Sequence, residues 1–195
     1  MRRVVVTICR EFGAEGHEIG KILGDRLQIP MYDKQLLEMS AKESGLALDR
    51  AAAIDEKASD RLLSNYMPLG TDALNDQLVR VESNLVRQLA EKGSCIIVGR
   101  LSDYVLREEP DAVKVLIMAP FEMRVAIIRE KHQITEEAAR KLVKKMDAAR
   151  SAYYNRYTNG KWGHETGKDI ILNRGTFGVV GCADVLEGII RKRMA

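Results

Sequence analysis

The sequence has few cysteines and histidines, and each shortage removes a class of protein from consideration. Its three cysteines lie far apart and include no Cys-x-x-Cys pair, which excludes a disulfide framework and the common zinc spacings. Its three histidines form no metal-binding pattern and no Ser-His-Asp or Cys-His arrangement. We therefore expect no metal-ligating residues of these kinds, and neither a zinc enzyme nor a triad hydrolase is favoured.

The chain also lacks an excess of charge and a long apolar run. A net charge of +3 without a basic arm does not favour a nucleic-acid partner. The apolar run at 4–9 is too short for a membrane span or for the core of a signal peptide. An odd number of cysteines without an export signal fits a reducing compartment. We therefore expect a cytoplasmic protein that binds neither nucleic acid nor membrane.

The chain instead shows an alternation of short apolar runs and amphipathic segments. The apolar runs predict strands at 4–9, 95–98, 113–118 and 169–173. Apolar residues at helical spacing predict helices at 19–27, 36–41, 71–92, 121–128 and 182–193. Thr135, with Glu136 and Glu137 in the first turn after it, predicts the start of another helix. The stretch 46–70 has no clear pattern and ends in a Pro68-Leu69-Gly70 break. The 195 residues therefore predict one α/β domain, a three-layer sandwich with a mostly parallel central sheet.

The carboxyl ends of parallel strands meet at one edge of a sheet, and ligands bind there in open α/β folds. The predicted strands bring short connecting segments to that edge, at residues 10–18, 99–100, 118–119 and 173–174. We expect the functional residues to lie in these segments.

The turn after the first strand is the leading candidate for a phosphate site. Gly13 and Gly16 permit a close backbone approach, and the following helix offers free amide groups and its positive dipole end. The complete phosphate-binding motif reads Gly-x-x-x-x-Gly-Lys-Ser/Thr. With Gly16 as the second glycine, Glu11 takes the first glycine position, His17 the lysine position and Glu18 the hydroxyl position.

These departures leave two interpretations of the turn open. The motif lysine supplies a permanent charge to the β- and γ-phosphates, whereas a histidine is mostly neutral near pH 7. Glu11, Glu15 and Glu18 also place negative charge where a phosphate would lie, and Arg10 and Lys21 are the nearby cations that could compensate. The alternative is that the turn binds no phosphate, because acidic residues in a first helical turn simply suit the helix dipole.

A second group of candidates lies on the predicted helix that follows Thr135. Asp147 and Arg150 are three residues apart, so they share one helix face. Lysines precede them and tyrosines follow, at Lys144, Lys145, Tyr153, Tyr154 and Tyr157. Tyrosines beside cations predict a surface that stacks a base or closes over a ligand. A solvated helix face is the alternative explanation.

Two further arginines, Arg100 and Arg124, each follow or open an element at the ligand-binding edge. The planar guanidinium group can bind phosphate through two parallel hydrogen bonds. Each arginine is therefore a candidate phosphate ligand, and a structural ion pair is the alternative.

The order and spacing of several segments carry a family resemblance. These segments are ICREFGAEGHEIG at 8–20, IPMYDKQLL at 29–37, IVGR at 97–100, APFEMR at 119–124 and DAARSAYY at 147–154. Together they resemble the cytidylate kinase-like proteins. The resemblance implies a P-loop nucleoside-monophosphate-kinase fold that uses ATP and Mg²⁺. It also implies a helical acceptor-binding insertion at about 33–92 and a lid at about 133–165.

The resemblance also implies roles for individual residues. The turn would bind the nucleotide phosphates, and Arg10 would compensate their charge. The residues of this nucleotide site are Arg10, Gly13, Ala14, Glu15, Gly16, His17 and Glu18. Catalytic residues would neutralise charge or belong to the lid, and these are Arg100, Arg124, Asp147 and Arg150. Leu101 departs from the pattern of cytidylate kinases, which carry an aspartate after the Gly-Arg pair.

Three functional hypotheses follow from these observations. The first is transfer of the γ-phosphoryl group from ATP·Mg²⁺ to a small acceptor, with a nucleoside monophosphate such as CMP as the expected acceptor. No general base can be named for this transfer from the sequence. The second is a catalytically inactive nucleotide-binding or regulatory protein on the same fold. The third makes the 71–92 helix a surface for a partner or a second copy, as in a homodimer, rather than a core helix.

Overall fold

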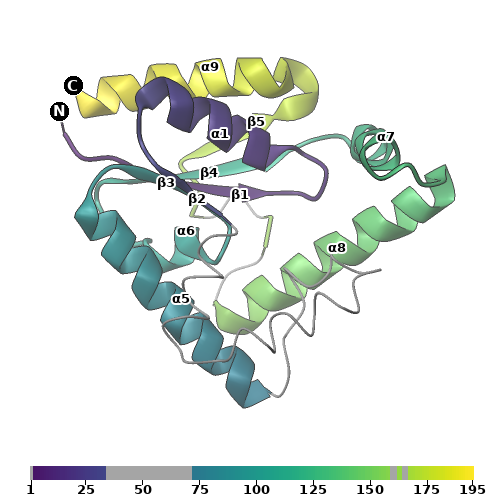
Figure 1. Ribbon diagram of the computed structural model, residues 1–195, viewed down its shortest axis with the longest axis horizontal. Coiled ribbons are helices and arrows are strands. Elements are labelled where there is room, and N and C mark those ends of the chain that lie inside the picture. Colours follow the sequence, from purple (N-terminus) through teal and green to yellow (C-terminus); the bar gives the residue numbers. More distant parts are fainter. Residues whose placement is uncertain (1, 34–71, 159–161, 164–166) are drawn as a thin grey trace.

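The computed structural model describes residues 2–33, 72–158, 162–163 and 167–195. Helices and strands alternate along most of these ranges, and α7 leads directly into α8 (Figure 1). In chain order they are β1 (Val5–Arg10), α1 (Gly16–Leu27), β2 (Met31–Tyr32), α5 (Asp72–Lys92), β3 (Cys95–Val98), α6 (Ser102–Val105), β4 (Ala112–Met118), α7 (Phe121–His132), α8 (Glu136–Tyr157), β5 (Ile170–Asn173) and α9 (Arg174–Met194). The predicted helix at 36–41 and the predicted break at 68–70 lie outside the described residues.

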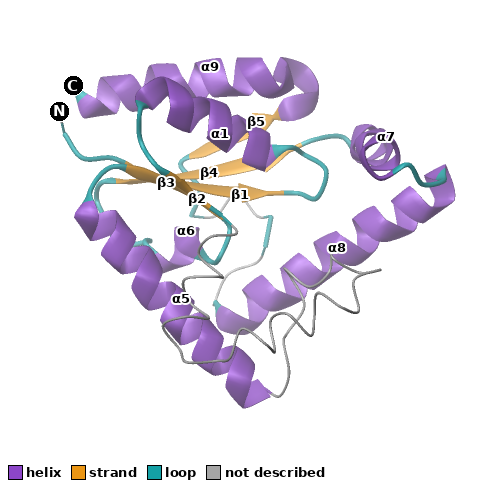
Figure 2. Cartoon of the chain, viewed as in Figure 1, coloured by secondary structure: helices purple, strands orange, loops and turns teal. Residues whose placement is uncertain are grey.

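The strands form one parallel sheet in the order β2-β3-β1-β4-β5 (Figure 2). The central strand β1 pairs with β3 and β4, and Val5 lies opposite Cys95 on one side and Ala112 on the other. β1 is buried from Val5 to Cys9. This burial on both faces explains why its sequence is nearly all apolar instead of alternating. The predicted α/β fold with a parallel central sheet is therefore confirmed.

Helices α1 and α9 cover one face of the sheet (Figure 1). The apolar stripe of α1, with Ile19 and Leu23 fully buried, faces this layer. Leu186 and Ile190 of α9 and Ile8 of β1 are buried in the same core. The periodic apolar residues of both helices thus do what their spacing predicts, because one stripe of each helix meets the sheet.

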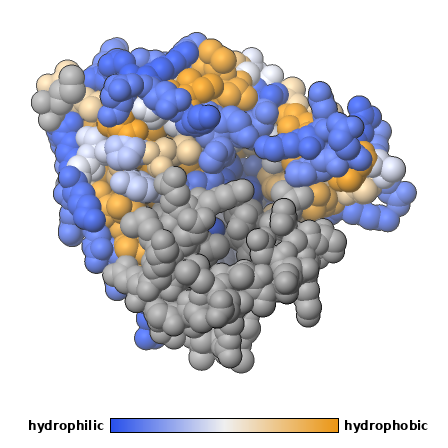
Figure 3. Space-filling view, viewed as in Figure 1, coloured by the Kyte–Doolittle hydropathy of each residue, from blue (hydrophilic) through white to orange (hydrophobic). Residues whose placement is uncertain are grey.

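The opposite face of the sheet is covered by α5 and α6. Leu85, Val86 and Leu89 of α5 are buried against Val5 and Ile97. The outer side of α5 is hydrophilic on the face drawn in Figure 3. The part of α5 that carries Leu85, Val86 and Leu89 is therefore a core element. The use of α5 as a surface for a partner or a second copy stays a prediction.

Helices α7 and α8 pack together beyond the carboxyl edge of the sheet (Figure 1). Their contact is an apolar cluster that includes Val125 and Ile128 of α7 and Val143 and Met146 of α8. Phe12, from the loop after β1, is buried in the same cluster. The loop after the central strand is thereby anchored to this helical pair.

The elements that the sequence did not predict correctly are short or rich in glycine. β2 has two residues and α6 has four, which is too few for a periodic pattern. α9 begins at Arg174 rather than at 182, because the Asn173 side chain accepts a hydrogen bond from the Gly175 amide at 2.9 Å and caps the helix directly after β5. Gly178, at φ 69°, kinks this helix and interrupts its apolar spacing.

Candidate phosphate-binding site

The loop between β1 and α1 turns sharply through two residues with positive φ, Gly13 at 84° and Glu15 at 57°. A Cβ atom at Gly13 would lie 3.1 Å from the carbonyl oxygen of Arg124, so both the backbone angle and the space favour glycine. Glu15 is the N-cap of α1 but makes no side-chain hydrogen bond to the first turn. The amide groups that open α1 therefore receive no cap from the Glu15 side chain, and among them the Glu18 amide contacts its own carboxylate.

A buried arginine holds this loop from behind. The Arg124 side chain is 7% exposed and pairs with Asp147 (Nη1–Oδ2, 2.6 Å) and Glu11 (Nε–Oε2, 3.3 Å). It also donates hydrogen bonds to the carbonyl oxygens of Phe12 and Ala119 at 3.1 and 3.0 Å. Asp147 accepts a hydrogen bond from the Phe12 amide at 2.9 Å. Arg124 and Asp147 thus fix the loop to α7 and α8, and their proposed part in catalysis stays a prediction.

The other acidic residues of the loop also have cationic partners. Glu15 pairs with Arg174 at the start of α9, and Glu18 pairs with Lys131 at the end of α7 at 3.1 Å. Burial raises the pKa of Glu18, but hydrogen bonds from its own backbone amide and from Lys131 outweigh burial, so the pKa is lowered overall. The negative charge of the loop is therefore largely compensated by neighbouring elements.

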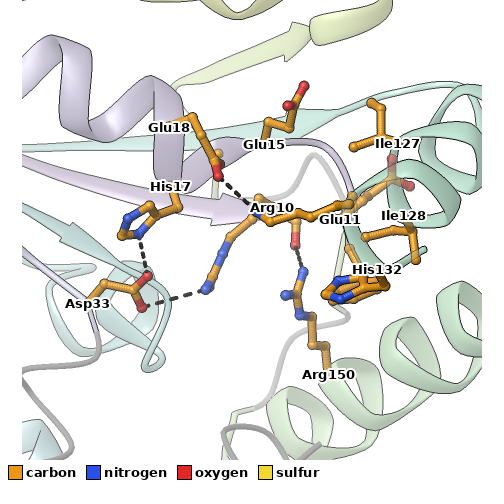
Figure 4. Close-up of a pocket in the computed structure, with 14 residues that line it drawn as sticks. Arg10, Glu11, Glu15, His17, Glu18, Asp33, Ile127, Ile128, His132 and Arg150 are labelled. Carbon is orange, nitrogen blue, oxygen red and sulfur yellow. Dashed lines mark hydrogen bonds and ion pairs between the residues drawn. The ribbon is translucent and has the colours of Figure 1, made fainter. Parts of the chain in front are cut away.

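The loop borders a cavity of about 430 Å³ (Figure 4). At one side of it, His17 Nδ1 lies 2.7 Å from Asp33 Oδ2. The other carboxylate oxygen of Asp33 lies 3.7 Å from Nη2 of Arg10. Asp33, directly after β2, is thereby held between two basic side chains.

Arg10 reaches Asp33 by passing two glycines. A Cβ atom on Gly16 would lie 2.8 Å from Cβ of Arg10, and one on Gly99 would overlap the Arg10 guanidinium. Gly99 also has a positive φ of 75°. A side chain at Gly99 would therefore displace Arg10 and strain the turn after β3.

Arg150 and Arg100 lie further along the same edge. Arg150 donates a hydrogen bond to the carbonyl oxygen of Arg10 at 2.9 Å, and its guanidinium lies 5.3 Å from the centre of the Phe12 ring. Arg100 donates to the buried carboxylate of Glu82 at 3.2 Å, and Tyr153 donates to the same carboxylate at 3.2 Å. These contacts connect α8 with both the loop and α5.

A buried ion pair lies beneath this edge. Asp103 of α6 pairs with Lys168, and their side chains are 6% and 3% exposed. Asp103 also accepts a hydrogen bond from the Tyr154 hydroxyl at 3.0 Å. Burial, with a contribution from the Asp103 charge, raises the pKa of the neighbouring Cys9 thiol to about 11. Cys9 is therefore protonated near neutral pH and is not a nucleophile.

The structure separates the predicted site residues by position. The cavity is lined by most of the predicted loop residues and by one predicted catalytic residue, namely Arg10, Gly13, Glu15, Gly16, His17, Glu18 and Arg150. Ala14 is instead buried in the apolar core. Arg124 and Asp147 lie behind the loop, and Arg100 contacts Glu82. The functional roles of all these residues stay predictions.

The cavity also contains residues to which the sequence assigned no role, above all Asp33, Lys131 and His132. Asp33 follows β2, which ends at the same edge of the sheet as β1. This position after a strand was the only feature of the sequence that could have indicated a role for Asp33. The short β2 gave too weak a pattern for that signal to be used. Lys131 and His132 end α7, where cations simply suit a helix C-terminus.

Two absences hold for the described part of the chain. No group of three or more His, Cys, Asp or Glu side chains there is arranged to hold a metal ion. No helix among the described residues is long and apolar enough to cross a membrane.

The parallel sheet in the order β2-β3-β1-β4-β5, with its glycine-containing turn after the central strand, matches the fold of P-loop kinases of known structure. The structure resembles shikimate kinase from Bacteroides thetaiotaomicron (TM-score 0.56, 12% identity, 97% of this chain and 99% of that chain). It also resembles TT1252 from Thermus thermophilus (TM-score 0.59, 15% identity, 98% of each chain). An uncharacterized protein from Eubacterium ventriosum matches with a TM-score of 0.76, at 26% identity over 97% of this chain and 99% of that chain.

The sequence identifies the family directly. The profile of the cytidylate kinase-like family matches residues 5–176, and the chain belongs to that family. No curated protein matches the sequence significantly. The family and the fold together describe a nucleotide-binding, kinase-like protein.

Proposed function

We propose that the protein transfers the γ-phosphoryl group of ATP to a small acceptor bound at the carboxyl edge of the sheet. One observation carries this proposal: α1 starts without a side-chain cap, and its loop borders a cavity of about 430 Å³. Unpaired amide groups at a helix N-terminus attract phosphate. Phosphoryl transfer requires mainly positioning and compensation of charge, which a rigid loop among paired cations supplies.

The residues of the loop fit a polyphosphate through the backbone more than through side chains. Gly13 and Glu15 have the left-handed backbone angles of turns whose successive amide groups can converge on an anion. Mg²⁺ bound with ATP would neutralise the phosphate charge, and it commonly takes one or two protein carboxylates. Glu18 and Asp33 are two of the four carboxylates that line the cavity among the described residues, and they would serve in place of the hydroxyl that the complete motif supplies.

The remaining roles follow from position. Arg150, at the cavity wall and fixed by the Arg10 carbonyl, would neutralise charge on the transferred group. Helix α8 lies within the predicted lid at 133–165, and it would exclude water during transfer. The predicted insertion at 33–92 would bind the acceptor, and a nucleoside monophosphate such as CMP is the acceptor that the family suggests. The buried, reduced cysteines fit a cytoplasmic location.

The test measures ADP formation with ATP, Mg²⁺ and each common nucleoside monophosphate, together with the ligand-dependent melting temperature. We expect Arg150→Ala to lower kcat about 10²–10³-fold, the scale for loss of one preorganised charge contact. Arg140→Ala is the matched control, because Arg140 lies on the same helix but pairs only with exposed glutamates among the described residues. Unchanged turnover in Arg150→Ala would remove Arg150 from the mechanism, and the absence of any nucleotide-induced shift would contradict the proposal.

A second candidate function is a non-catalytic nucleotide-binding protein. The orientation of His17 favours it, because the residue at the lysine position pairs with Asp33. His17→Lys distinguishes the two cases. A large gain in ATP affinity in His17→Lys would support a loop with the conformation found in active kinases. Nucleotide binding without ADP formation for any acceptor would favour the non-catalytic binding protein.

A further inference from the structure

The loop after β1 contains a glutamate in a backbone conformation that favours glycine. Glu15 has φ 57° and ψ 29°, which lies in the left-handed region. Four other non-glycine residues have positive φ among the described residues, and these are Gln28, Arg100, Leu101 and Gln133. Gln28 and Gln133 end helices, where a left-handed residue is common. Glu15 instead precedes a helix, so its conformation needs support from a neighbouring group.

The neighbouring group is Arg174 at the start of α9. The Glu15 carboxylate pairs with the Arg174 guanidinium, and the two side chains are 23% and 20% exposed. The other terminal nitrogen of Arg174 lies 3.1 Å from the sulfur of Met123 on α7. Figure 4 shows the Glu15 side chain extending away from Asp33 and Arg150. The pair therefore turns the Glu15 charge away from that side of the cavity and joins the loop to α9.

Arg174 itself has a fixed position. It follows β5 directly, and the Asn173 side chain caps α9 at the Gly175 amide. A Cβ atom on Gly175 would lie 2.6 Å from Cδ of Pro120, so the start of α9 packs closely against the turn after β4. β4 lies between β1 and β5 in the sheet. Arg174 is therefore anchored to the same sheet that carries the loop.

Loss of this support would change how often the loop holds its conformation. A glutamate whose side chain has no fixed partner prefers negative φ. The peptide groups on either side of Glu15 would then rotate, and one of them carries the Gly16 amide that opens α1. A ligand that needs the left-handed turn binds with an apparent Kd that rises as the fraction of protein in that conformation falls.

We propose that Arg174 is a positioning residue for nucleotide binding, because its ion pair with Glu15 holds the loop in the conformation that receives the phosphates. This inference rests on the proposed transfer from ATP. Arg174 acts through Glu15 and not by contact with the nucleotide. Glu15, whose charge alone would oppose a phosphate, thereby supports the site through its partner.

The test measures the Kd for ATP·Mg²⁺ by calorimetry in single and double variants. Arg174→Met should raise the Kd about tenfold, because only about a tenth of the molecules then hold the left-handed turn. The KM for ATP should rise with the Kd while kcat changes little, since the bound loop is the same. Arg26→Met is the matched control and should leave the Kd unchanged. Arg26 also joins α1 to α9, through Asp184 and Glu187, but at the end of α1 that is distant from the loop.

Two double variants separate the backbone conformation from the charge. Glu15→Gly in the Arg174→Met background removes the carboxylate and permits the left-handed turn, so it should return the Kd close to the wild-type value. Glu15→Ala removes the same carboxylate but keeps a Cβ atom, so its Kd should stay about tenfold above that of the glycine variant. Without ligand, the glycine double variant should melt at a higher temperature than the alanine one. Arg174→Gln replaces Arg174→Met if the latter fails to fold, as judged by its thermal melt.

The outcomes separate this inference from the proposed function. Equal recovery of ATP binding by the glycine and alanine double variants would show that Arg174 only screens charge. Unchanged ATP binding in Arg174→Met would exclude a role of Arg174 in binding. Either result would overturn the inference and leave phosphoryl transfer standing, whereas absence of ATP binding by the wild type would overturn both.

Discussion

The two halves of this molecule are held together by different forces. Between the sheet and the α1–α9 layer, the buried groups are aliphatic, with Ile8, Leu23 and Leu186 fully buried. At the carboxyl edge, charged groups are buried beside the apolar cluster of α7 and α8, as in the pairs Arg124–Asp147 and Lys168–Asp103. The first region gains stability from area removed from water, and the second depends on matching each charge with a partner.

This difference indicates where function is to be sought. Apolar packing is non-directional, so it fixes the layers without aiming any polar group. A buried ion pair is satisfied only in one geometry, and it often adds little net stability. Charged groups that are costly to bury but hold a loop in place are therefore best understood as supporting a site.

Loss of a buried charge should have the largest effect on stability. Arg124→Met removes the cation that pairs with Asp147 and Glu11 and leaves two partly buried carboxylates without it. We expect a loss of about 3–5 kcal/mol in the free energy of unfolding, measured by chemical denaturation at constant pH. Arg140→Met is the matched control, because its ion pairs are exposed, and it should leave the midpoint unchanged. Equal effects of the two variants would contradict the distinction between the regions.

Truncation in the apolar layer should cost somewhat less. Leu186→Ala leaves a cavity under α9, where the side chain is fully buried, and we expect a loss of about 2–5 kcal/mol. Val185→Ala on the exposed side of the same helix should change stability by no more than about 0.5 kcal/mol. If the two variants have the same denaturation midpoint, α9 is not packed as described.

Loss of a local cap should have a smaller effect than either. Thr135 Oγ1 accepts a hydrogen bond from the Ala138 amide at 3.2 Å and caps α8. Thr135→Ala should therefore lower stability by about 1 kcal/mol, as measured by thermal or chemical unfolding. Thr135→Ser keeps the hydroxyl, and a loss as large as that of the alanine variant would assign the effect to something other than the cap.

The smallest expected effect is on thiol chemistry. The pKa of Cys9 is raised to about 11, mainly by burial, so only about one thiol in a thousand is ionised at pH 8. We expect Cys9 in the folded protein to resist a thiol reagent at pH 8 and to react once denaturant is added, as followed by mass spectrometry. Rapid labelling of the native protein at Cys9 would show that this edge opens to solvent.

The same contrast explains how much the sequence could predict. The strands β1, β3, β4 and β5 follow from apolar runs and the helix α5 from apolar periodicity, and both patterns report directly on burial. The helix α8 follows from its capping residue Thr135. The turn at Gly13 to Gly16 follows from its place after a buried strand. Arg124 could be read as a phosphate ligand or as a structural pair, and its partners Glu11 and Asp147 are distant in sequence, so periodicity cannot choose between these options.

Part of the candidate site was beyond sequence reasoning for the same reason. Asp33 lies after a strand of two residues, and only the register of β2 beside β3 brings it to His17 and Arg10. Glu82, buried on a helix predicted to be amphipathic, pairs with Arg100 across the sheet edge. Pairing of charges from different elements depends on tertiary geometry, which composition and spacing do not encode locally.

The central claim is that the loop after β1 binds the phosphates of a nucleotide. The most direct test is a calorimetric titration of the protein with ATP and Mg²⁺, compared with the same titration using adenosine. We predict one saturable site per chain for ATP, and binding of adenosine at least about tenfold weaker because the phosphates supply the contacts with the loop. Equal affinities for ATP and adenosine, or no heat with ATP, would contradict the claim.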